Sequence, residues 1–579
     1  ELIGSDTTRD CATMWAMRII VTLGILFTFA SAEPGIADQG IADELVLFYD
    51  NLSTVEFDPR LAVRMNPPAK GPIVISPTEP WETWAVLGYH SVLRAPDGQA
   101  RMYYDCIEGS GVPPGRAAKG LGVMGGDSHR RICLAVSEDG VQWTKPILGI
   151  FNRTDPKTNA TSTLNNILLE DSGVSVFLDH APNVPESQRW KMISSYYAYM
   201  SADGLHWTKM SGKAATSDAD DTKPTAFYDP HLGKYVVYVR RDLEPGYVRA
   251  IGRCLTDDLT NWEKEMPAGQ HCPTVFLPDE LDPASGFDVY TNSWTPYPSI
   301  EKPAVHLFFP SMYFHFGSNP WGHGNDGLLD IRMLVSRDGA SLGYVQNASN
   351  ARSAYVALGD NSCGAGLGSR PEVHGGWCNE FSGELAYTAT DTSAMYMASG
   401  FLFSSDGGSV LQYSSAQSLT HGGDGSTQTW GANTGIRLLS TRRDGFTFVE
   451  APYLMRTNIT DLPALTTAPV PIPSACQSGA VLRINMQTGV AGIVATEVQD
   501  ANGTALKGYT LTESDPVKGS NLGAIPTWSQ GQTVKLPNGL ASVRVKLAMT
   551  DAKLFSVRTS CFSGAPPRAS SVHQVSAYV

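Results

Sequence analysis

Two short stretches with the same arrangement decide the fold, Ser137-Glu-Asp139-Gly140-Val-Gln-Trp143 and Ser201-Ala-Asp203-Gly204-Leu-His-Trp207. In each, the aspartate can accept hydrogen bonds from the backbone amides that follow it, and the glycine can adopt a positive φ. A bulky apolar residue stands four positions after the aspartate. This combination predicts a tight turn between two β-strands.

The same turn pattern recurs, with variation, at 256–262, 336–342 and 442–448. Strand-prone apolar segments lie upstream of the five turns, at 101–105, 190–194, 235–239, 305–309 and 395–398. A shorter candidate strand precedes each of these, at 86–93, 166–169, 225–228, 289–293 and 385–388. Strand, turn, strand and turn repeated five times is typical of radial four-stranded blades. The sequence therefore predicts an all-β chain built on a five-bladed β-propeller.

Composition changes after the last repeat and suggests a second module. Residues 466–475 are rich in proline and are expected to form an extended linker. Alternating strand segments then predict a small β-sandwich over 476–562, followed by a mobile tail at 563–579. The propeller is expected to span 33–465, and 1–32 to hold a leader and a signal peptide.

The N-terminal region indicates export. Met17-Arg18 precedes a short apolar run that ends in the small-x-small pattern Ala30-Ser31-Ala32, as in a secretory signal peptide. The mature chain would keep eight cysteines, for which we expect disulfides in sequence order: 106–133, 254–272, 363–378 and 476–561. Six N-x-[ST] sequons suggest an extracellular glycoprotein.

Charge excludes two classes of partner. The net charge of −14 leaves no broad basic field for nucleic acid and no attraction to an anionic membrane surface. We therefore expect neither partner once the signal peptide is removed. The oligomeric state is left open.

The repeats followed by a sandwich resemble the five-bladed propeller glycoside hydrolases, the invertase- and arabinanase-like superfamily, and more narrowly the family-32-like glycosyl hydrolases. The resemblance covers about 44–560 and is carried by 81–104, 221–240, 288–292, 309–316, 325–327 and 443–446. The invertase motif W-[MI]-N-D-P-N-G is missing, and Tyr228-Asp229-Pro230 is the nearest match to R-D-P. Specificity for sucrose or fructan is therefore not expected.

Glycoside hydrolysis needs one carboxylic acid that protonates the leaving oxygen and one carboxylate that acts as base or nucleophile. In a propeller of this kind such groups would lie where the innermost strands begin. Asp221 and Asp288 precede or open the third and fourth blades, and Glu380 precedes the fifth. We expect Asp221 and Asp288 to act as base or nucleophile and as electrostatic modulator, in either order, with Glu380 as the acid.

Further residues are candidates for binding a sugar, although each taken singly could equally be a core or surface residue. Tryptophan rings suit the C–H face of a sugar, imidazoles can bond hydroxyls, and Arg240 could pair with a carboxylated or sulfated sugar. The candidates are Trp84, His90, Asn166, Arg240, His315, Asp326, Trp377 and His421. No cofactor is required and no metal ligands are assigned, although the Asp-rich stretch 218–221 leaves a structural Ca²⁺ ion open.

The resemblance thus implies a secreted hydrolase that cleaves glycosidic bonds in an extracellular polysaccharide or glycoconjugate. The main alternative is a carbohydrate-binding or extracellular-matrix propeller without catalysis. A sialidase-like enzyme is less favoured, because its turn motif S-x-D-x-G-x-x-W is one residue longer than the motif here.

Overall fold

A computed structural model describes residues 44–109, 129–194, 197–210, 222–243, 248–260, 272–282, 287–317, 326–359, 393–417, 421, 434–455, 458–476, 479–529, 531 and 535–561. Over these ranges the regular secondary structure is almost entirely strand, and the only helical elements are the 3₁₀ turns Glu186–Gln188 and Ile459–Asp461. Neither turn has the length or the apolar character needed to cross a bilayer. The predicted all-β class is confirmed.

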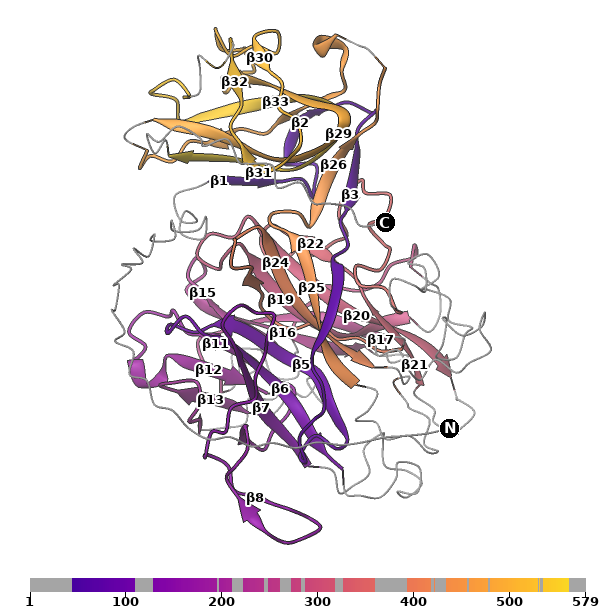
Figure 1. Ribbon diagram of the computed structural model, residues 1–579, viewed down its shortest axis with the longest axis vertical. Helices are drawn as coiled ribbons and strands as arrows, with labels where there is room; N and C mark the ends of the chain where they lie inside the picture. Colours follow the sequence, from indigo (N-terminus) through magenta and orange to yellow (C-terminus); the bar gives the residue numbers. More distant parts are fainter. Residues whose placement is uncertain are drawn as a thin grey trace, which may run out of the picture.

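Five antiparallel four-stranded sheets form the blades of a propeller (Figure 1). Blade 1 consists of β5 (Ala85–Arg94), β6 (Ala100–Glu108), β7 (His129–Ser137) and β10 (Ile167–Leu169). Blade 2 consists of β11 (Ser175–Leu178), β12 (Trp190–Ile193), β13 (Ala198–Ser201) and β14 (Thr208–Lys209). Blade 3 consists of β15 (Thr225–Asp229), β16 (Lys234–Leu243), β17 (Val248–Thr256) and β18 (Thr274–Phe276).

The last two blades complete the ring. Blade 4 consists of β19 (Phe287–Tyr297), β20 (Val305–Gly317), β21 (Asp326–Ile331) and β22 (Leu334–Ser336). Blade 5 consists of β23 (Leu402–Phe403), β24 (Ser409–Gln417), β25 (Thr434–Arg442) and β4 (Ala69–Ile75). Because β4 comes from the N-terminal side of the chain and pairs with β25, the two ends of the propeller sequence are joined by backbone hydrogen bonds.

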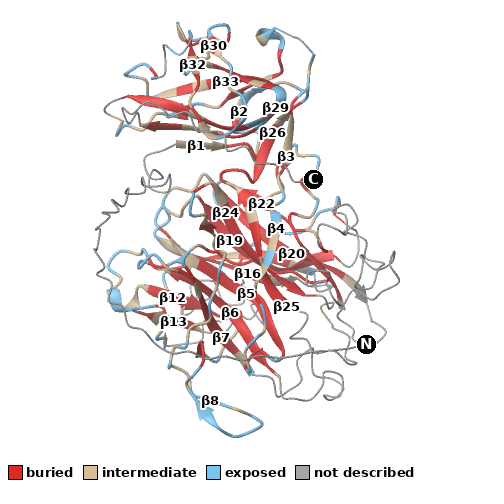
Figure 2. Cartoon of the chain, in the orientation of Figure 1, coloured by how far each residue is buried: buried red, intermediate tan, exposed pale blue. Residues whose placement is uncertain are grey.

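The first strand of each blade lies at the axis, where β5, β11, β15 and β19 contact one another in turn. Blade strands are buried on both faces because each sheet packs between two others, as β12 shows with four buried residues in succession (Figure 2). Runs of consecutive buried residues are therefore typical of these strands, as in β6, where all nine residues are buried.

The aspartate–glycine turns fasten neighbouring blades together. The Oδ1 atom of Asp203 accepts the amides of Leu205 (2.8 Å) and His206 (2.9 Å), and Gly204 has a φ of 73°. The carbonyl of Gly204 accepts the Tyr103 hydroxyl of blade 1 at 3.0 Å. Equivalent bonds join Tyr413 to Gly140 and Tyr238 to Gly339, so a second-strand tyrosine holds the turn of an adjoining blade at three blade boundaries.

A nine-stranded sheet beyond the propeller forms the sandwich around a core that includes Trp528. Its centre is the pairing of β29 (Ala480–Gln499) with β33 (Ser542–Cys561). The remaining strands are β1 (Glu44–Leu47), β2 (Thr54–Phe57), β3 (Ala62–Met65), β26 (Thr447–Ala451), β27 (Ala464–Thr467), β28 (Val470–Pro471) and β31 (Ser520–Ala524). Two further two-stranded sheets pair β30 (Ser514–Asp515) with β32 (Thr527–Trp528), and β8 (Arg153–Thr154) with β9 (Thr161–Ser162).

Segments far apart in the sequence therefore share the sandwich. Strands β1 and β2 precede the propeller in the chain, yet β1 pairs with β33 and β2 with β27. The proline-rich stretch 466–475 contributes the end of β27 and all of β28, and both strands pair with β33. The extended backbone expected for 466–475 is present, but it is hydrogen-bonded into the sheet.

Two segments occupy other strand positions than expected. The segment 166–169, expected to open the second blade, contains β10, which pairs with β7 as the last strand of blade 1. The segment 395–398, expected as a second strand, lies at the axis, since Ala394 and Met397 bridge to β24 and Ser399 bridges to Ser91 of β5. Strand propensity indicates an extended segment but does not specify its neighbours.

Three of the expected disulfides are present: Cys106–Cys133, Cys254–Cys272 and Cys476–Cys561. The first two join strands or loops within one blade, and the third closes the sandwich between the start of β29 and the end of β33. The fourth expected pair, 363–378, lies outside the described residues, as do the leader, the signal peptide and the C-terminal tail.

Candidate functional site

Asp288 stands at the end of the propeller that faces away from the sandwich. It is the second residue of β19 and lies opposite Tyr313 of β20. At the other end of β19, the Tyr297 hydroxyl donates to Asp444 Oδ1 at 2.6 Å, and Arg558 of the sandwich contacts the same carboxylate. A strand rises about 3.3 Å per residue, so Asp288 is roughly 30 Å from this junction.

The two carboxylate oxygens of Asp288 have different surroundings. Oδ2 lies 3.3 Å from the backbone amide and 3.5 Å from the guanidinium of Arg249, and 3.3 Å from Nε2 of His315. Oδ1 is buried and has no hydrogen-bond partner among the described residues. Asp288 as a whole is only 4% exposed. A buried carboxylate oxygen without a donor is costly, so this atom is poised to accept a hydrogen bond from a bound molecule.

A second acid reaches the same region from the β16–β17 hairpin. Asp242 and Arg249 lie opposite each other in register, and Nε of Arg249 is 3.7 Å from Asp242 Oδ1. Arg240 is two residues before Asp242, hence on the same face of β16, and its Nε is 3.4 Å from the same oxygen. Arg241 points to the opposite face, towards Gly252.

Tyrosine rings from three blades form an apolar cluster beside these charges. Tyr89 of β5 and Tyr396, on the inner segment of blade 5, have ring centroids 5.2 Å apart. Tyr290 of β19 lies 5.9 Å from Tyr396 and 5.6 Å from Tyr313 of β20. We call these four rings the tyrosine cluster. Side chains from blades 1, 4 and 5 thus meet at the axis, next to the charged groups of blades 3 and 4.

His421 joins this arrangement from blade 5. Its Nδ1 is 3.1 Å from the Tyr313 hydroxyl, and its ring lies 4.7 Å from that of Tyr290. His315 packs on Tyr313 with ring centroids 3.8 Å apart. The structure therefore brings together four of the predicted residues: Asp288, Arg240, His315 and His421.

A polar group lies deeper at the axis, around His90. Its Nδ1 is 2.9 Å from the Gly88 carbonyl, and its Nε2 is buried without a partner among the described residues. Lys223 donates to the His90 carbonyl at 2.9 Å. Burial, followed by the charge of Lys223, lowers the pKa of His90 to about 3 and keeps the imidazole neutral. Burial lowers the pKa of Lys223 to about 7 and raises that of the fully buried Asp105 to about 7.

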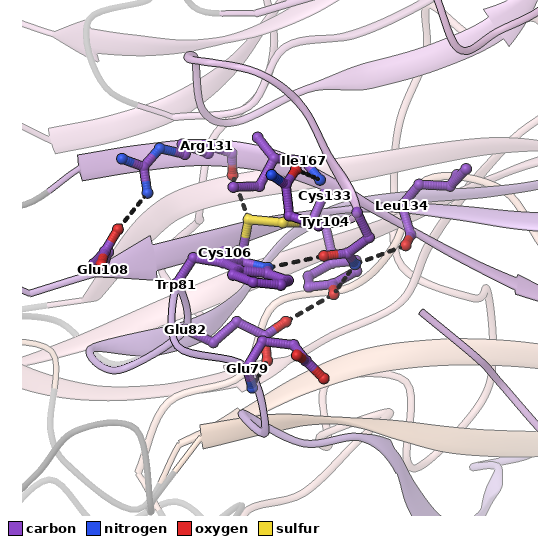
Figure 3. The surroundings of a disulfide bond; sticks show 12 residues. Glu79, Trp81, Glu82, Tyr104, Cys106, Glu108, Arg131, Cys133, Leu134 and Ile167 are labelled. Carbon is purple, nitrogen blue, oxygen red and sulfur yellow. Dashed lines mark hydrogen bonds and ion pairs between the residues drawn. A yellow bond between two sulfur atoms is a disulfide. The ribbon is translucent and has the colours of Figure 1, made fainter. Parts of the chain in front are cut away.

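Asn166 is buried in blade 1, directly before β10. Figure 3 shows its bonding partners Trp81, Tyr104 and Leu134 around the Cys106–Cys133 disulfide. The amide oxygen of Asn166 accepts the Trp81 indole N–H at 2.8 Å, and its amide nitrogen contacts the Tyr104 hydroxyl and the Leu134 carbonyl. These bonds occupy the amide group, so we do not place Asn166 in the site. Trp84 is also buried, beside Gly109.

The remaining predicted residues cannot be placed by their side chains. Asp221, Glu380 and Trp377 lie outside the described residues, and Asp326 is placed only as the first residue of β21, in register with Gly317. Within the part of the chain that is described, no group of three or more His, Cys, Asp or Glu residues could hold a metal ion.

Sequence reasoning missed Asp242, Arg249 and the tyrosine cluster. The rule that site residues precede innermost strands finds Asp288, but Asp242 and Arg249 lie on the second and third strands of blade 3. One signal was available: 242 and 249 flank a short hairpin connection, so they had to face each other at the same end of the blade.

No protein-family model and no curated protein sequence matches this chain. It is similar in structure to glycoside hydrolases. One solved structure described as a glycoside hydrolase is 12% identical, covers 65% of this chain and 92% of its own, and has a TM-score of 0.36. A fructofuranosidase from Schwanniomyces occidentalis is 12% identical, with 88% and 99% covered and a TM-score of 0.32. The β-fructofuranosidase of Bombyx mori is 11% identical, with 88% and 95% covered and a TM-score of 0.32. At these identities and TM-scores, such similarities assign no role to any residue of this chain.

Proposed function

We propose that the protein cleaves glycosidic bonds, with Asp288 as a catalytic carboxylate at the end of the propeller axis. The observation that carries this proposal is the buried Oδ1 of Asp288, which has no donor among the described residues, while the other oxygen, Oδ2, contacts Arg249 and His315. A fixed carboxylate with one open oxygen suits a nucleophile, or a base that orients water. It is also a good acceptor for a sugar hydroxyl.

The tyrosine cluster supports a saccharide as the ligand. Aromatic rings bury the C–H faces of sugars, while the neighbouring carboxylates, imidazoles and guanidinium groups bond the hydroxyls. Tyr89, Tyr290 and Tyr396 are each less than 10% exposed, with values of 7%, 6% and 6%. Such a packed aromatic cluster next to charged groups at the axis is suited to a bound sugar ring.

Asp221 and Glu380 complete the proposal. Two-carboxylate chemistry needs an acid for the leaving oxygen in addition to Asp288. Asp242 is the other described carboxylate at the site, but its ion-pair contacts are with two arginines, Arg240 and Arg249, which suit a positioning role. We therefore keep Glu380 as the proposed acid and Asp221 as the proposed second base or modulator.

The test is hydrolysis of a panel of aryl glycosides and plant or algal polysaccharides by the full chain. Asp288→Asn should lower kcat by about 100- to 10,000-fold with little change in folding, because the amide keeps the shape and loses the charge. The matched control is Asp50→Asn, which removes a carboxylate paired with Arg337 near the start of the sandwich and should leave kcat unchanged. An Asp288→Asn variant that is as active as the parent would refute the proposal.

One observation favours the alternative of carbohydrate binding without cleavage. Both described carboxylates of the site lie beside the same guanidinium, that of Arg249, which is typical of a neutralised binding network. Saccharide binding by the parent chain, together with no turnover on any substrate in the panel, would decide for this alternative.

We also propose that the protein is secreted and carries N-linked glycans. The support is the signal-like segment, the three disulfides and the exposure of all six sequon asparagines in the folded structure. These asparagines are Asn51, Asn152, Asn159, Asn347, Asn458 and Asn502. Expression in eukaryotic cells should yield protein in the medium whose mass falls on treatment with an N-glycanase. Retention inside the cell at the unmodified mass would contradict this.

A further inference from the structure

Arg249 is a partly buried arginine that is held by aromatic rings. Its guanidinium lies over the rings of Tyr290 and Tyr313, at 5.6 and 5.7 Å from their centroids, and its side chain is 17% exposed. Stacking on aromatic faces fixes the plane of the group without using its N–H donors. The cation is thus positioned beside Asp288 while its edge stays available.

The ion pairs of Arg249 are long compared with others in the same molecule. Charge-assisted N–H to carboxylate bonds are usually about 2.7–2.9 Å. Arg332 forms such a pair with Asp330, at 2.8 and 2.9 Å, in the neighbouring blade. Arg249 stands 3.5 Å from Asp288 and 3.7 Å from Asp242. Its five donors are therefore not fully engaged by these carboxylates.

We propose that Arg249 binds an oxyanion of the ligand, so that the preferred substrate is a saccharide bearing carboxylate or sulfate groups. This rests on the proposed function, in that the ligand is a saccharide at the tyrosine cluster. A planar guanidinium matches the two oxygens of a carboxylate or sulfate, which a lysine ammonium does not. The oxyanion takes the donors that Asp288 and Asp242 leave free.

Charge balance at the site permits this binding. Among the described residues, the charged side chains at the site are two arginines, Arg240 and Arg249, and two aspartates, Asp242 and Asp288, which cancel in formal charge. The described part of the site therefore adds no net negative charge against an anionic ligand, although the whole chain carries −14.

The experiment is isothermal titration calorimetry of the full chain with trigalacturonate, a sulfated galactose trisaccharide, neutral galactotriose and inorganic phosphate. We expect both acidic trisaccharides to bind about ten- to a hundred-fold more tightly than the neutral one, which is the gain in affinity expected from one charged hydrogen-bond pair. Arg249→Gln should abolish this preference, and Arg249→Lys should retain only part of it. Arg337→Gln, a matched loss of charge near the sandwich, should leave the preference intact.

Each outcome is informative. An acidic-to-neutral affinity ratio near one in the parent, or an unchanged ratio in Arg249→Gln, overturns the inference. If Arg249→Gln fails to fold, the ratio measured for Arg249→Lys decides in the same way. Tight binding of phosphate that depends on Arg249, without preference between the trisaccharides, would show that the oxyanion is free in solution and not part of the sugar.

The two proposals can fail separately. If Asp288→Asn abolishes cleavage of a neutral glycan while Arg249→Gln has no effect on the ratio, the glycosidase proposal stands and the oxyanion inference falls. If the acidic trisaccharides bind through Arg249 but no glycan is ever cleaved, the oxyanion inference stands and the protein is a binder of acidic saccharides.

Discussion

Replacing Gly204 by alanine tests whether the aspartate–glycine turns hold the blades together. Gly204 is buried with a φ of 73°, and an added Cβ would lie 2.7 Å from the Tyr103 hydroxyl and 2.9 Å from two ring atoms of Trp190. Both neighbours belong to packed second strands and cannot easily move. Gly98 is the matched control, since it has a φ of 87°, is exposed, and has no heavy atom within 4 Å of an added Cβ.

The magnitude follows from three contributions. A left-handed alanine costs about 1 kcal/mol in either variant. In Gly204→Ala, losing the Tyr103 hydrogen bond adds about 1 kcal/mol and overpacking against Trp190 about 2 kcal/mol. We therefore expect a loss of stability of about 4 kcal/mol for Gly204→Ala and about 1 kcal/mol for Gly98→Ala.

The assay is differential scanning calorimetry of the two variants and of Tyr103→Phe, which removes only the hydroxyl. For a propeller of this size the difference of about 3 kcal/mol corresponds to a Tm roughly 4 °C lower in Gly204→Ala than in Gly98→Ala. Tyr103→Phe, which loses only the hydrogen bond of about 1 kcal/mol, should have a Tm close to that of Gly98→Ala. Equal Tm values for the two glycine variants would refute the claim that this turn is a clamp between blades 1 and 2.

Three further predictions concern other parts of the molecule. Burial raises the pKa of Asp105 from 3.8 to about 7, so the native state holds a proton that the unfolded chain releases. The stability that this proton provides is complete at low pH and is lost, by a few kcal/mol, as pH rises towards 7. Asp105→Asn should remove this loss. Urea unfolding of the parent and the variant at pH 4 and at pH 7 measures it, and an equal change of the urea midpoint between the two pH values in both proteins would contradict the prediction. Opening the Cys476–Cys561 bridge, which closes an 85-residue separation, with a double serine variant should destabilise the sandwich by about 4 kcal/mol in urea unfolding; an unchanged midpoint would exclude a stabilising bridge. Tyr297→Phe should lower the free energy of unfolding by about 2 kcal/mol, because the Asp444 carboxylate loses a buried donor at the junction with the sandwich. Equal rates of proteolysis at that junction in the parent and the variant would argue against this.

The blades could be predicted because their signal is local. An aspartate that bonds amides two and three residues ahead, and a glycine with positive φ, act within a single turn, as at Asp139 and Gly140. Such interactions need no distant partner, so each copy of the pattern indicates a turn wherever it occurs. Disulfide order followed from short separations in the same way, and three of the expected pairs are present.

The site could be predicted only in part. The position of Asp288 at the start of an innermost strand makes it a candidate from the sequence, and His315 and His421 are candidates only as residue types that suit sugars. Arg249 and Asp242 became site residues only because the β16–β17 hairpin places them beside the start of β19. Four tyrosines from three blades could not be grouped from a sequence in which 89 and 396 are 307 positions apart.

The sequence alone determined the all-β class, the number of blades and the aspartate at the start of the fourth, because these depend on hydrogen bonds and backbone preferences within a few residues. The tertiary structure alone decided which strands are neighbours: 166–169 ends blade 1, β4 closes blade 5, and β1 enters the sandwich. Strand pairing is chosen by burial and by hydrogen bonds between distant segments, and those energies have no counterpart in local spacing. The open oxygen of Asp288 and the partly used donors of Arg249 likewise appear only when five separate blades meet around one axis.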